Sequence, residues 1–301
     1  MKLVSFLRPG SAEPHPGALL SATNEVVDFL SEEAGIPAPD RYLDWFDIDG
    51  SALAEAQALT DALGSDSRRL ESMRAVGAIV ARGAVRLIAP VPRPGKVICI
   101  GLNYRDHAAE SKMAIPERPL VFSKFPTSVC GPGDTVRIPR GCEQLDYEAE
   151  LGVVVGKRAR DVAVADGLEH VLGYVNLNDV SARDFQFADG QWQRGKSCDT
   201  FAPMGEYVAT REEIADPHRL RIRLRLNGDT MQDSSTDQLI FRVPELIASL
   251  SEAFTLEPGD VIATGTPPGV GFARKPPVWL KAGDRVEVEI EGLGVLVNSI
   301  G

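Results

Sequence analysis

The stretch Asp146-Tyr147-Glu148-Ala149-Glu150-Leu151-Gly152-Val153-Val154-Val155-Gly156 begins with acidic residues and ends as an apolar, β-branched run. Such a run between glycines is typical of a buried strand. Because side chains two residues apart in a strand point to the same face, Glu148 and Glu150 should lie side by side at the edge of a core. Two adjacent carboxylates repel each other, and their burial without a partner is costly. They therefore indicate either a divalent cation held by oxygen ligands or two solvated glutamates on an exposed edge strand.

Composition narrows the class of protein. The chain has 301 residues, of which 44% are hydrophobic and 25% charged, which suits one large globular domain or two smaller ones. A net charge of -11 argues against a nucleic-acid partner, because no excess of basic residues is available to neutralise phosphates. No apolar segment approaches the length of a membrane span, so we expect no membrane partner.

The cysteines and histidines bear on location and on metal type. The four cysteines are scattered without a CxxC pair, which indicates reduced thiols and a cytoplasmic protein. The N-terminus becomes polar too soon to resemble a signal peptide. No two of the four histidines are spaced as in a zinc site, so an oxygen-liganded hard cation is the better expectation.

The pattern divides the chain into a small N-terminal α/β module, residues 1–90, and a larger unit, residues 91–301, joined by the proline-rich residues 89–95. In the module we expect strands at 2–7, 18–21 and 26–30 and helices at 51–63 and 67–82. The larger unit is richer in strands. Strands are expected at 96–101, 119–124, 148–155, 173–179, 220–226, 261–264, 286–290 and 295–297, and helices at 162–172 and 243–254. Asn227-Gly228 predicts a tight β-hairpin.

A candidate acid–base pair follows the strand expected at 96–101. Asn103 is suited to cap a short helix on which His107 and Glu110 lie three residues apart, on one face. A carboxylate that holds a histidine fixes its tautomer and stabilises the imidazolium, as a general base requires. The alternative is an ordinary surface ion pair.

Three further features have the character of a site. Asp179, Arg183 and Gln186 fall on one face of a short helix, with Asp179 or Ser181 near its N-cap; the alternative is a capping residue with a stabilising ion pair. Lys196 lies between small residues in the loop 190–201, although a solvated lysine is the default. The glycine-rich residues 265–271 could offer backbone N–H groups to an anion, but they lack the GK[ST] of a nucleotide-binding loop.

Taken together, six short motifs resemble those of the fumarylacetoacetate hydrolase superfamily, in the same order and over residues 96–301. They are YRDHAAE at 104–110, DYEAEL at 146–151, NDVSARD at 178–184, GKS at 195–197, DTF at 199–201 and GDVIATGTPPGVG at 259–271. The resemblance implies a β-rich α+β fold in which a rolled, mixed β-sheet forms the catalytic domain. It also implies a homodimer, because dimers are usual among relatives.

The resemblance assigns roles to the candidate residues. It implies Mg²⁺ or Mn²⁺ held by Glu148, Glu150 and Asp179. Catalytic roles are implied for the base pair His107 and Glu110 and for Lys196. Substrate contacts are implied for Arg183, Gln186, Thr266 and Lys124. The position of a fourth acidic ligand in the fumarylacetoacetate-cleaving branch is Ile100 here, which favours the acylpyruvate branch.

The predicted function is therefore a Mg²⁺- or Mn²⁺-dependent hydrolase that cleaves a C–C bond of an acylpyruvate or another 2,4-dioxo acid. The metal would stabilise the enolate, His107 would activate water, and Lys196 would supply fixed positive charge. The same site would also suit an oxaloacetate-type decarboxylase or an isomerase or hydratase of a 2-oxo-dienoate. A binding protein without activity is a third alternative, against which the co-occurrence of all these groups argues. Residues 113–118, 187–192 and 272–277 are expected to form the specificity pocket.

Overall fold

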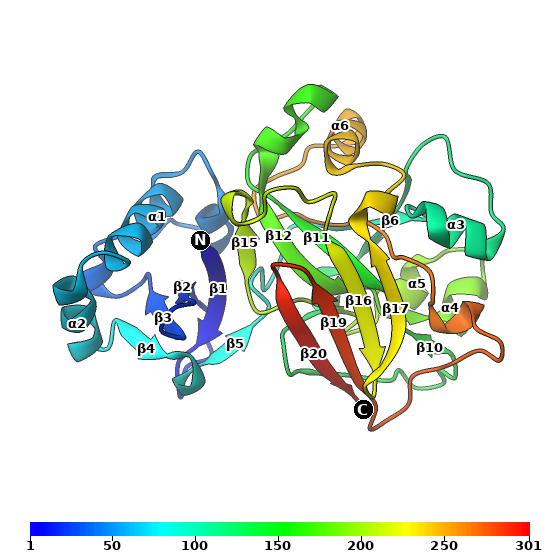
Figure 1. Cartoon of the computed structure of the whole chain (residues 1–301), viewed down its shortest axis with the longest axis horizontal. Helices are drawn as coiled ribbons and strands as arrows, with labels where there is room; N and C mark the ends of the chain where they lie inside the picture. Colours follow the sequence, from blue (N-terminus) through cyan, green and yellow to red (C-terminus); the bar gives the residue numbers. More distant parts are fainter.

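The computed structural model describes residues 1–301, and an 11-stranded sheet runs through it (Figure 1). Its main path is β4-β3-β2-β1-β15-β12-β11-β18-β6-β7, and β5 pairs with β1. The predicted strand is β11 (Ala149–Val155), which pairs antiparallel with β12 (Val171–Asn178) on one side and β18 (Val261–Ala263) on the other. Because β18 pairs parallel with β6 (Val97–Gly101), the sheet is mixed, as expected.

The remaining elements surround this frame. The other strands of the large sheet are β1 (Lys2–Leu7), β2 (His15–Leu20), β3 (Glu25–Asp28), β4 (Ile79–Ala81), β5 (Arg86–Ile88), β7 (Leu120–Lys124) and β15 (Val208–Thr210). A 5-stranded sheet is made of β17 (Asp229–Ser235), β16 (Arg221–Leu226), β19 (Arg285–Ile290), β20 (Gly294–Ile300) and β9 (Thr135–Val136). Two short pairs are β8 (Val129–Cys130) with β14 (Ala202–Pro203), and β10 (Leu145–Asp146) with β13 (Ser181–Ala182). The α-helices are α1 (Ser51–Leu63), α2 (Ser67–Ala75), α3 (Arg105–Ser111), α4 (Arg183–Phe187), α5 (Gln193–Lys196) and α6 (Val243–Ala253).

Strand β11 is apolar from Leu151 onward because both of its faces are buried. Val153 belongs to the apolar cluster that includes Ile222 and Val288 of the 5-stranded sheet. Val154 belongs to a second cluster that includes Val27 and Phe29 of the N-terminal residues. Consecutive strand residues point to opposite faces, so this alternation explains a continuous β-branched run at the centre of the molecule.

The N-terminal residues extend the same sheet rather than forming a sheet of their own. Strand β1 pairs antiparallel with β15, with Lys2 opposite Ala209 and Leu3 opposite Val208. Figure 1 shows α1 and α2 on the outer side of these strands, at the left. Residues 1–90 thus share a sheet and an apolar cluster with the rest of the chain, and the division at residue 90 stays a prediction.

Two predicted helices are wrong in extent. Within residues 162–172, where an α-helix is expected, Val164–His170 form a 3₁₀-helix. Strand β12 follows directly from Val171. A Cβ atom on Gly167 would lie 2.7 Å from Cα of Pro244, so close packing against α6 shapes this segment more than helix propensity does. The helix expected at 67–82 ends at Ala75, because Gly77 adopts a positive φ of 75° and the chain then enters β4.

Both predicted helix caps are also wrong. Tyr104, not Asn103, precedes α3, and no side chain caps it. Asn103 instead donates to the carbonyl of Thr264 at 2.7 Å and so fixes the end of β18. Likewise, α4 follows Ala182 without a side-chain cap. By contrast, the hairpin at Asn227-Gly228 is confirmed, with both residues at positive φ between β16 and β17.

Two expectations about the whole chain can be compared with the structure. None of its helices combines the length and the apolar character that crossing a membrane requires. All four cysteines are free thiols, as predicted.

Candidate active site

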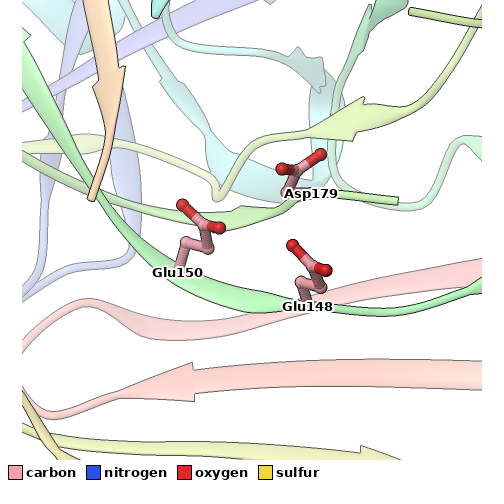
Figure 2. A group of neighbouring side chains, drawn as sticks. All are labelled: Glu148, Glu150 and Asp179. Atoms are coloured by element: carbon pink, nitrogen blue, oxygen red, sulfur yellow. The ribbon is translucent and has the colours of Figure 1, made fainter. Parts of the chain in front are cut away.

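Three carboxylates meet where β11 begins and β12 ends. Glu148 precedes β11, Glu150 lies in it, and Asp179 follows β12. The antiparallel register, continued by a bond of 2.9 Å from the Asp179 N–H to the Glu148 carbonyl, brings these positions together. Figure 2 shows the three side chains converging, and their nearest carboxylate oxygens all lie within 4.8 Å of one another. All three are buried, so the alternative of solvated glutamates is wrong.

Cationic side chains are distributed unevenly over this cluster. The Lys196 ammonium donates to Glu148 at 2.9 Å and to Asp179 at 2.8 Å. Lys124 pairs with the other oxygen of Asp179. Glu150 forms no ion pair; its Oε2 accepts a bond of 2.8 Å from the backbone N–H of Gly265.

The two glutamates consequently differ in proton affinity. Burial and the carboxylates of Asp179 and Glu148 raise the pKa of Glu150 well above its usual range. Burial opposes ionisation of Glu148 too, but Lys196 and Arg183 outweigh it and lower the pKa of Glu148 to about 2. The three carboxylates supply hard oxygen ligands, and no cation offsets the repulsion between Glu150 and its two carboxylate neighbours. This arrangement suits Mg²⁺ or Mn²⁺, so the residues present fit the predicted metal.

The predicted base pair lies on α3. His107 Nδ1 is 3.3 Å from Glu110 Oε2, and the same carboxylate accepts from the Gly269 N–H at 3.2 Å. With Nδ1 engaged by Glu110, Nε2 is the ring nitrogen left for a reacting group. The His107 side chain lines a cavity of about 260 Å³ that Glu148, Glu150 and Lys196 also line. The structure thus brings the base pair and the carboxylate cluster to one site.

The glycine-rich loop serves this site and not an external anion. The N–H of Gly265 donates to Glu150, that of Gly269 to Glu110, and that of Gly271 to Asp146 at 2.7 Å. The backbone donors that suggested anion binding are therefore occupied by carboxylates of the chain itself. Glycine is required at two of these positions, since a Cβ on Gly269 or Gly271 would fall 2.1 or 2.0 Å from a backbone oxygen.

Asp146 is a positioning residue that sequence reasoning did not single out. Its carboxylate accepts from Gly271 N and Phe272 N and pairs with the buried Arg183 at 2.9 Å. Arg183 in turn donates to Glu148 at 2.5 Å and to Gln186 at 2.9 Å. Asp146 opens the stretch that predicts β11, but an acidic residue before a strand carries no signal for this role.

The predicted substrate contacts fall into two groups. Arg183, Gln186 and Thr266 line the cavity. Lys124 does not line it: its ammonium is buried against Asp179 and the Val180 carbonyl. The structure thus gives Lys124 a role in holding Asp179, and direct contact with substrate has no geometric support.

Comparison with known proteins identifies the class. A family model described as "Fumarylacetoacetate (FAA) hydrolase C-terminal" matches residues 96–301, so the chain belongs to the fumarylacetoacetate hydrolase family. Among its relatives, "Oxaloacetate tautomerase fahd2, mitochondrial" of Xenopus laevis is 42% identical, over 100% of this chain and 90% of that protein. "Oxaloacetate tautomerase FAHD2A, mitochondrial" of Homo sapiens is 40% identical, over 100% of this chain and 91% of that protein.

Solved structures agree with this placement. The fumarylacetoacetate hydrolase of Exiguobacterium antarcticum superposes with a TM-score of 0.81 at 34% identity and covers 100% of this chain and 99% of that one. The 5-carboxymethyl-2-hydroxymuconate delta-isomerase of Mycobacterium smegmatis gives 0.75 at 31% identity, with the same coverage. The predicted superfamily and the strand-rich mixed fold are confirmed.

The comparisons also bear on two expectations, the location and the reaction. The prediction of a cytoplasmic location is wrong, because relatives from Xenopus laevis, Rattus norvegicus and Homo sapiens are named as mitochondrial. The chain is a metal-dependent enzyme of the fumarylacetoacetate hydrolase family. Hydrolysis of a C–C bond is not confirmed, because similar proteins are named tautomerases and isomerases. These names favour the alternative reactions over hydrolysis.

Proposed function

We propose that this enzyme interconverts the keto and enol forms of a 2-oxo acid of the oxaloacetate type, with Mg²⁺ or Mn²⁺ as cofactor. The observation that supports this proposal is that His107, held by Glu110, lines the same cavity as Glu148 and Glu150 of the carboxylate cluster. A base beside a site for a chelating 2-oxo acid is the minimum that enolisation requires. The names of the relatives support tautomerisation as the reaction type.

The metal would be held by Glu148, Glu150 and Asp179. When bound, it would supply Lewis-acid polarisation of the substrate's 2-oxo oxygen, which makes the hydrogens on C3 more acidic. The protein ligands are fixed before binding by Lys196, Arg183 and the Gly265 N–H, so little reorganisation is needed.

His107 would carry the proton. Its Nε2 accepts the proton as the C3–H bond breaks, and the imidazolium then returns it to the oxygen on C2, so that the substrate leaves as the enol. Glu110 stabilises the charged imidazolium through Nδ1. Lys196 lines the cavity and places a fixed positive charge beside the developing negative charge.

Hydrolysis of an acylpyruvate and decarboxylation of oxaloacetate are the competing reactions, because both also proceed through an enolate. They differ in the bond that breaks. Enolisation leaves the carbon skeleton intact, hydrolysis of acetylpyruvate releases acetate and pyruvate, and decarboxylation releases CO₂. Product analysis therefore separates all three with one protein preparation.

The test follows oxaloacetate enol absorbance together with pyruvate and CO₂ formation, with Mg²⁺, with Mn²⁺ and with chelator. We expect metal-dependent acceleration of keto–enol conversion, with pyruvate formed far more slowly. His107→Asn should remove the acceleration and retain metal binding. Pyruvate or CO₂ formed as fast as the enol is consumed would instead support decarboxylation, and cleavage of acetylpyruvate as the main activity would support hydrolysis.

We also propose the homodimer that the family resemblance implies. Strand β7 lies at the end of the large sheet and pairs only with β6. Its residues Leu120 and Val121 are 44% and 45% exposed. An apolar edge strand of this kind favours pairing with a second chain.

A further inference from the structure

The cavity is lined by more residues than the proposed function uses. The segments from which the sequence predicts specificity contribute Met113, Phe187, Trp192 and Phe272. Aromatic rings lie close to the two cations of the cavity: the Phe272 ring is centred 4.7 Å from the Arg183 guanidinium carbon, and the Phe122 ring 5.1 Å from Lys196 Nζ. These rings cover the cations and reinforce their position beside the carboxylate cluster.

Most of the polar side chains in the cavity already have partners within the protein. Each of the three guanidinium nitrogens of Arg183 donates to a side chain. Lys196 uses two of its three donors on the carboxylate cluster, and the proposed function assigns the third to the developing enolate. The Thr266 hydroxyl donates to a backbone carbonyl at 2.9 Å, so its proton is also engaged.

The hydroxyl of Ser111, the last residue of α3, is an exception. Ser111 lines the same cavity, and its buried hydroxyl oxygen has no hydrogen-bond partner in the protein. A serine or threonine in a helix commonly donates to the carbonyl four residues earlier, as Thr60 does to Ala56 in α1 at 2.7 Å. Ser111 makes no such bond. Because a buried hydroxyl without a partner is costly, a ligand that supplies an acceptor is favoured there.

The position of Ser111 on α3 relates it to one particular part of the substrate. It lies one helical turn beyond His107, and side chains four residues apart on a helix have Cβ atoms about 5–6 Å apart. The proposed base removes a proton from C3, so C3 must lie within reach of His107 Nε2. The C4 carboxylate of oxaloacetate is bonded directly to C3 and can therefore reach the part of the cavity that Ser111 lines.

We infer that the Ser111 hydroxyl donates a hydrogen bond to the C4 carboxylate of the substrate and thereby favours enolisation over loss of CO₂. This inference rests on the proposed function, because it takes the substrate to be a 2-oxo acid of the oxaloacetate type. It goes further in naming the group that recognises the second carboxylate and in giving a reason why that carboxylate is retained.

The two reactions differ in what they do to this hydrogen bond. Enolisation breaks the C3–H bond: His107 takes the proton, the electron pair forms the C2–C3 double bond, the C2 oxygen takes the negative charge, and the C4 carboxylate keeps its own. Decarboxylation breaks the C3–C4 bond: its electron pair forms the same double bond, and the carboxylate leaves as neutral CO₂. A donor to the carboxylate stabilises the reactant of decarboxylation more than its transition state, so it slows CO₂ loss and leaves enolisation unopposed.

The test measures keto–enol conversion of oxaloacetate and release of CO₂ in the Mg²⁺-loaded wild type and in Ser111→Ala, after subtraction of the rates with Mg²⁺ alone. We expect the KM for oxaloacetate to rise at least about tenfold, the usual effect of losing a hydrogen bond to a charged group. The ratio of CO₂ release to keto–enol conversion should rise by a similar factor. A KM within about twofold of the wild type, or an unchanged ratio, would overturn the inference.

A second substrate separates recognition of the carboxylate from a structural effect on α3. In 2-oxobutanoate a methyl group replaces the C4 carboxylate, and exchange at C3 is followed by ¹H NMR in D₂O. Ser111→Ala should leave this Mg²⁺-dependent exchange unchanged. An equal loss of activity with both substrates would show that Ser111 acts through the position of His107 and would contradict the inference.

Two further variants serve as controls. Ser111→Cys keeps nearly the same volume but offers only a weak donor, so it should behave like Ser111→Ala. A Ser111→Cys protein with wild-type KM and product ratio would contradict the role of the hydroxyl, even if Ser111→Ala failed to fold. Ser65→Ala is the matched control, because the exposed Ser65 hydroxyl follows α1, donates to the Ala62 carbonyl and lines no part of this cavity; it should leave both quantities unchanged.

Failure of this inference is distinguishable from failure of the proposed function. If neither oxaloacetate nor 2-oxobutanoate undergoes metal-dependent enolisation in the wild type, then the proposed function is wrong. If both substrates enolise and Ser111→Ala does not discriminate between them, then enolisation stands and only the role of Ser111 is wrong.

Discussion

Glu148 and Glu150 are neighbours with opposite electrostatic environments. Glu148 is bound by Arg183 and Lys196, whereas Glu150 has one backbone donor and no cation. Cationic side chains therefore compensate the negative charge of Glu148, whereas the negative charge of Glu150 is left in excess. That excess is the local reason for divalent metal to bind at the three-carboxylate cluster, because the metal relieves repulsion that folding alone leaves in place.

Substitution of the two glutamates should have opposite effects on the metal-free protein. Glu150→Gln removes a buried carboxyl group whose ionisation is opposed by burial and by its carboxylate neighbours, and it should raise the free energy of unfolding by on the order of 1 kcal/mol at pH 8. Glu148→Gln leaves Arg183 and Lys196 short of a partner and should cost about 3 kcal/mol. Urea unfolding in chelator measures both. Equal destabilisation by the two variants would contradict this account.

The base pair allows a second residue-scale prediction. His107→Ala should lower kcat by about 10²- to 10⁴-fold, the usual contribution of a general base. Glu110→Gln keeps a partner for Nδ1 but removes the charge, so its loss should be smaller. Calorimetric Mg²⁺ affinity serves as the control and should change little in either variant, because neither residue belongs to the carboxylate cluster.

At the residue scale, the family resemblance predicts site residues that local spacing alone does not bring together. Strand periodicity places Glu148 and Glu150 on one face, but only the antiparallel register of β11 and β12 adds Asp179. The position of Lys124 behind Asp179 and the role of Asp146 depend on tertiary contacts that no spacing encodes.

Among the elements, helix α6 is tied to the strand-rich half by a histidine. The N–H of Val243, the first residue of α6, donates to His218 Nε2 at 3.1 Å, while His218 Nδ1 lies 3.2 Å from Asp216. Both contacts suit the neutral ring. Burial, opposed in part by Asp216, lowers the pKa of His218 below its usual value of 6.5.

Stability should therefore depend on pH through His218. Because the folded pKa is the lower one, the unfolded chain binds the proton first, so this contribution is present above pH 6.5 and is lost as the pH falls toward the folded pKa. His218→Gln should reduce the difference in Tm between pH 7.5 and pH 5.5, because glutamine has no proton to gain over this range. An unchanged difference would show that other groups dominate.

Elements with strong local signals are predictable here, and those set by packing are not. The hairpin at Asn227-Gly228 and the helix expected at 243–254 were predicted correctly. The segment 162–172 did not, because Gly167 packs against Pro244 and residues 171 and 172 are drawn into β12. Similarly, Asn103 has the character of a cap in sequence, but the carbonyl of Thr264 takes its side chain.

Over the whole molecule, one sheet connects the N-terminal residues with the active site. Its path runs from β4 through β1 and β15 to β12 and β11, which position the carboxylates. At its far end is β7, whose Phe122 also lines the cavity. An interface formed along β7 would consequently border the substrate site.

The proposed dimer is tested at that edge. Val121→Lys introduces a charge into an apolar edge strand, and we expect it to shift the protein from dimer to monomer in light scattering coupled to size exclusion. Val295→Lys is the matched control, since Val295 is 41% exposed and lies on β20 of the other sheet. A wild-type protein that is monomeric at micromolar concentration would refute the dimer outright.

The central claim is that Glu148, Glu150 and Asp179 bind a divalent metal that enables His107 to enolise a 2-oxo acid. Deuterium exchange at C3, followed by ¹H NMR in D₂O across a Mg²⁺ titration, tests it most directly. We predict exchange that rises with occupancy of one metal site in the wild type and is lost in Glu150→Gln and in His107→Asn. Exchange that persists in chelator, or that survives in Glu150→Gln without metal binding, would contradict the claim.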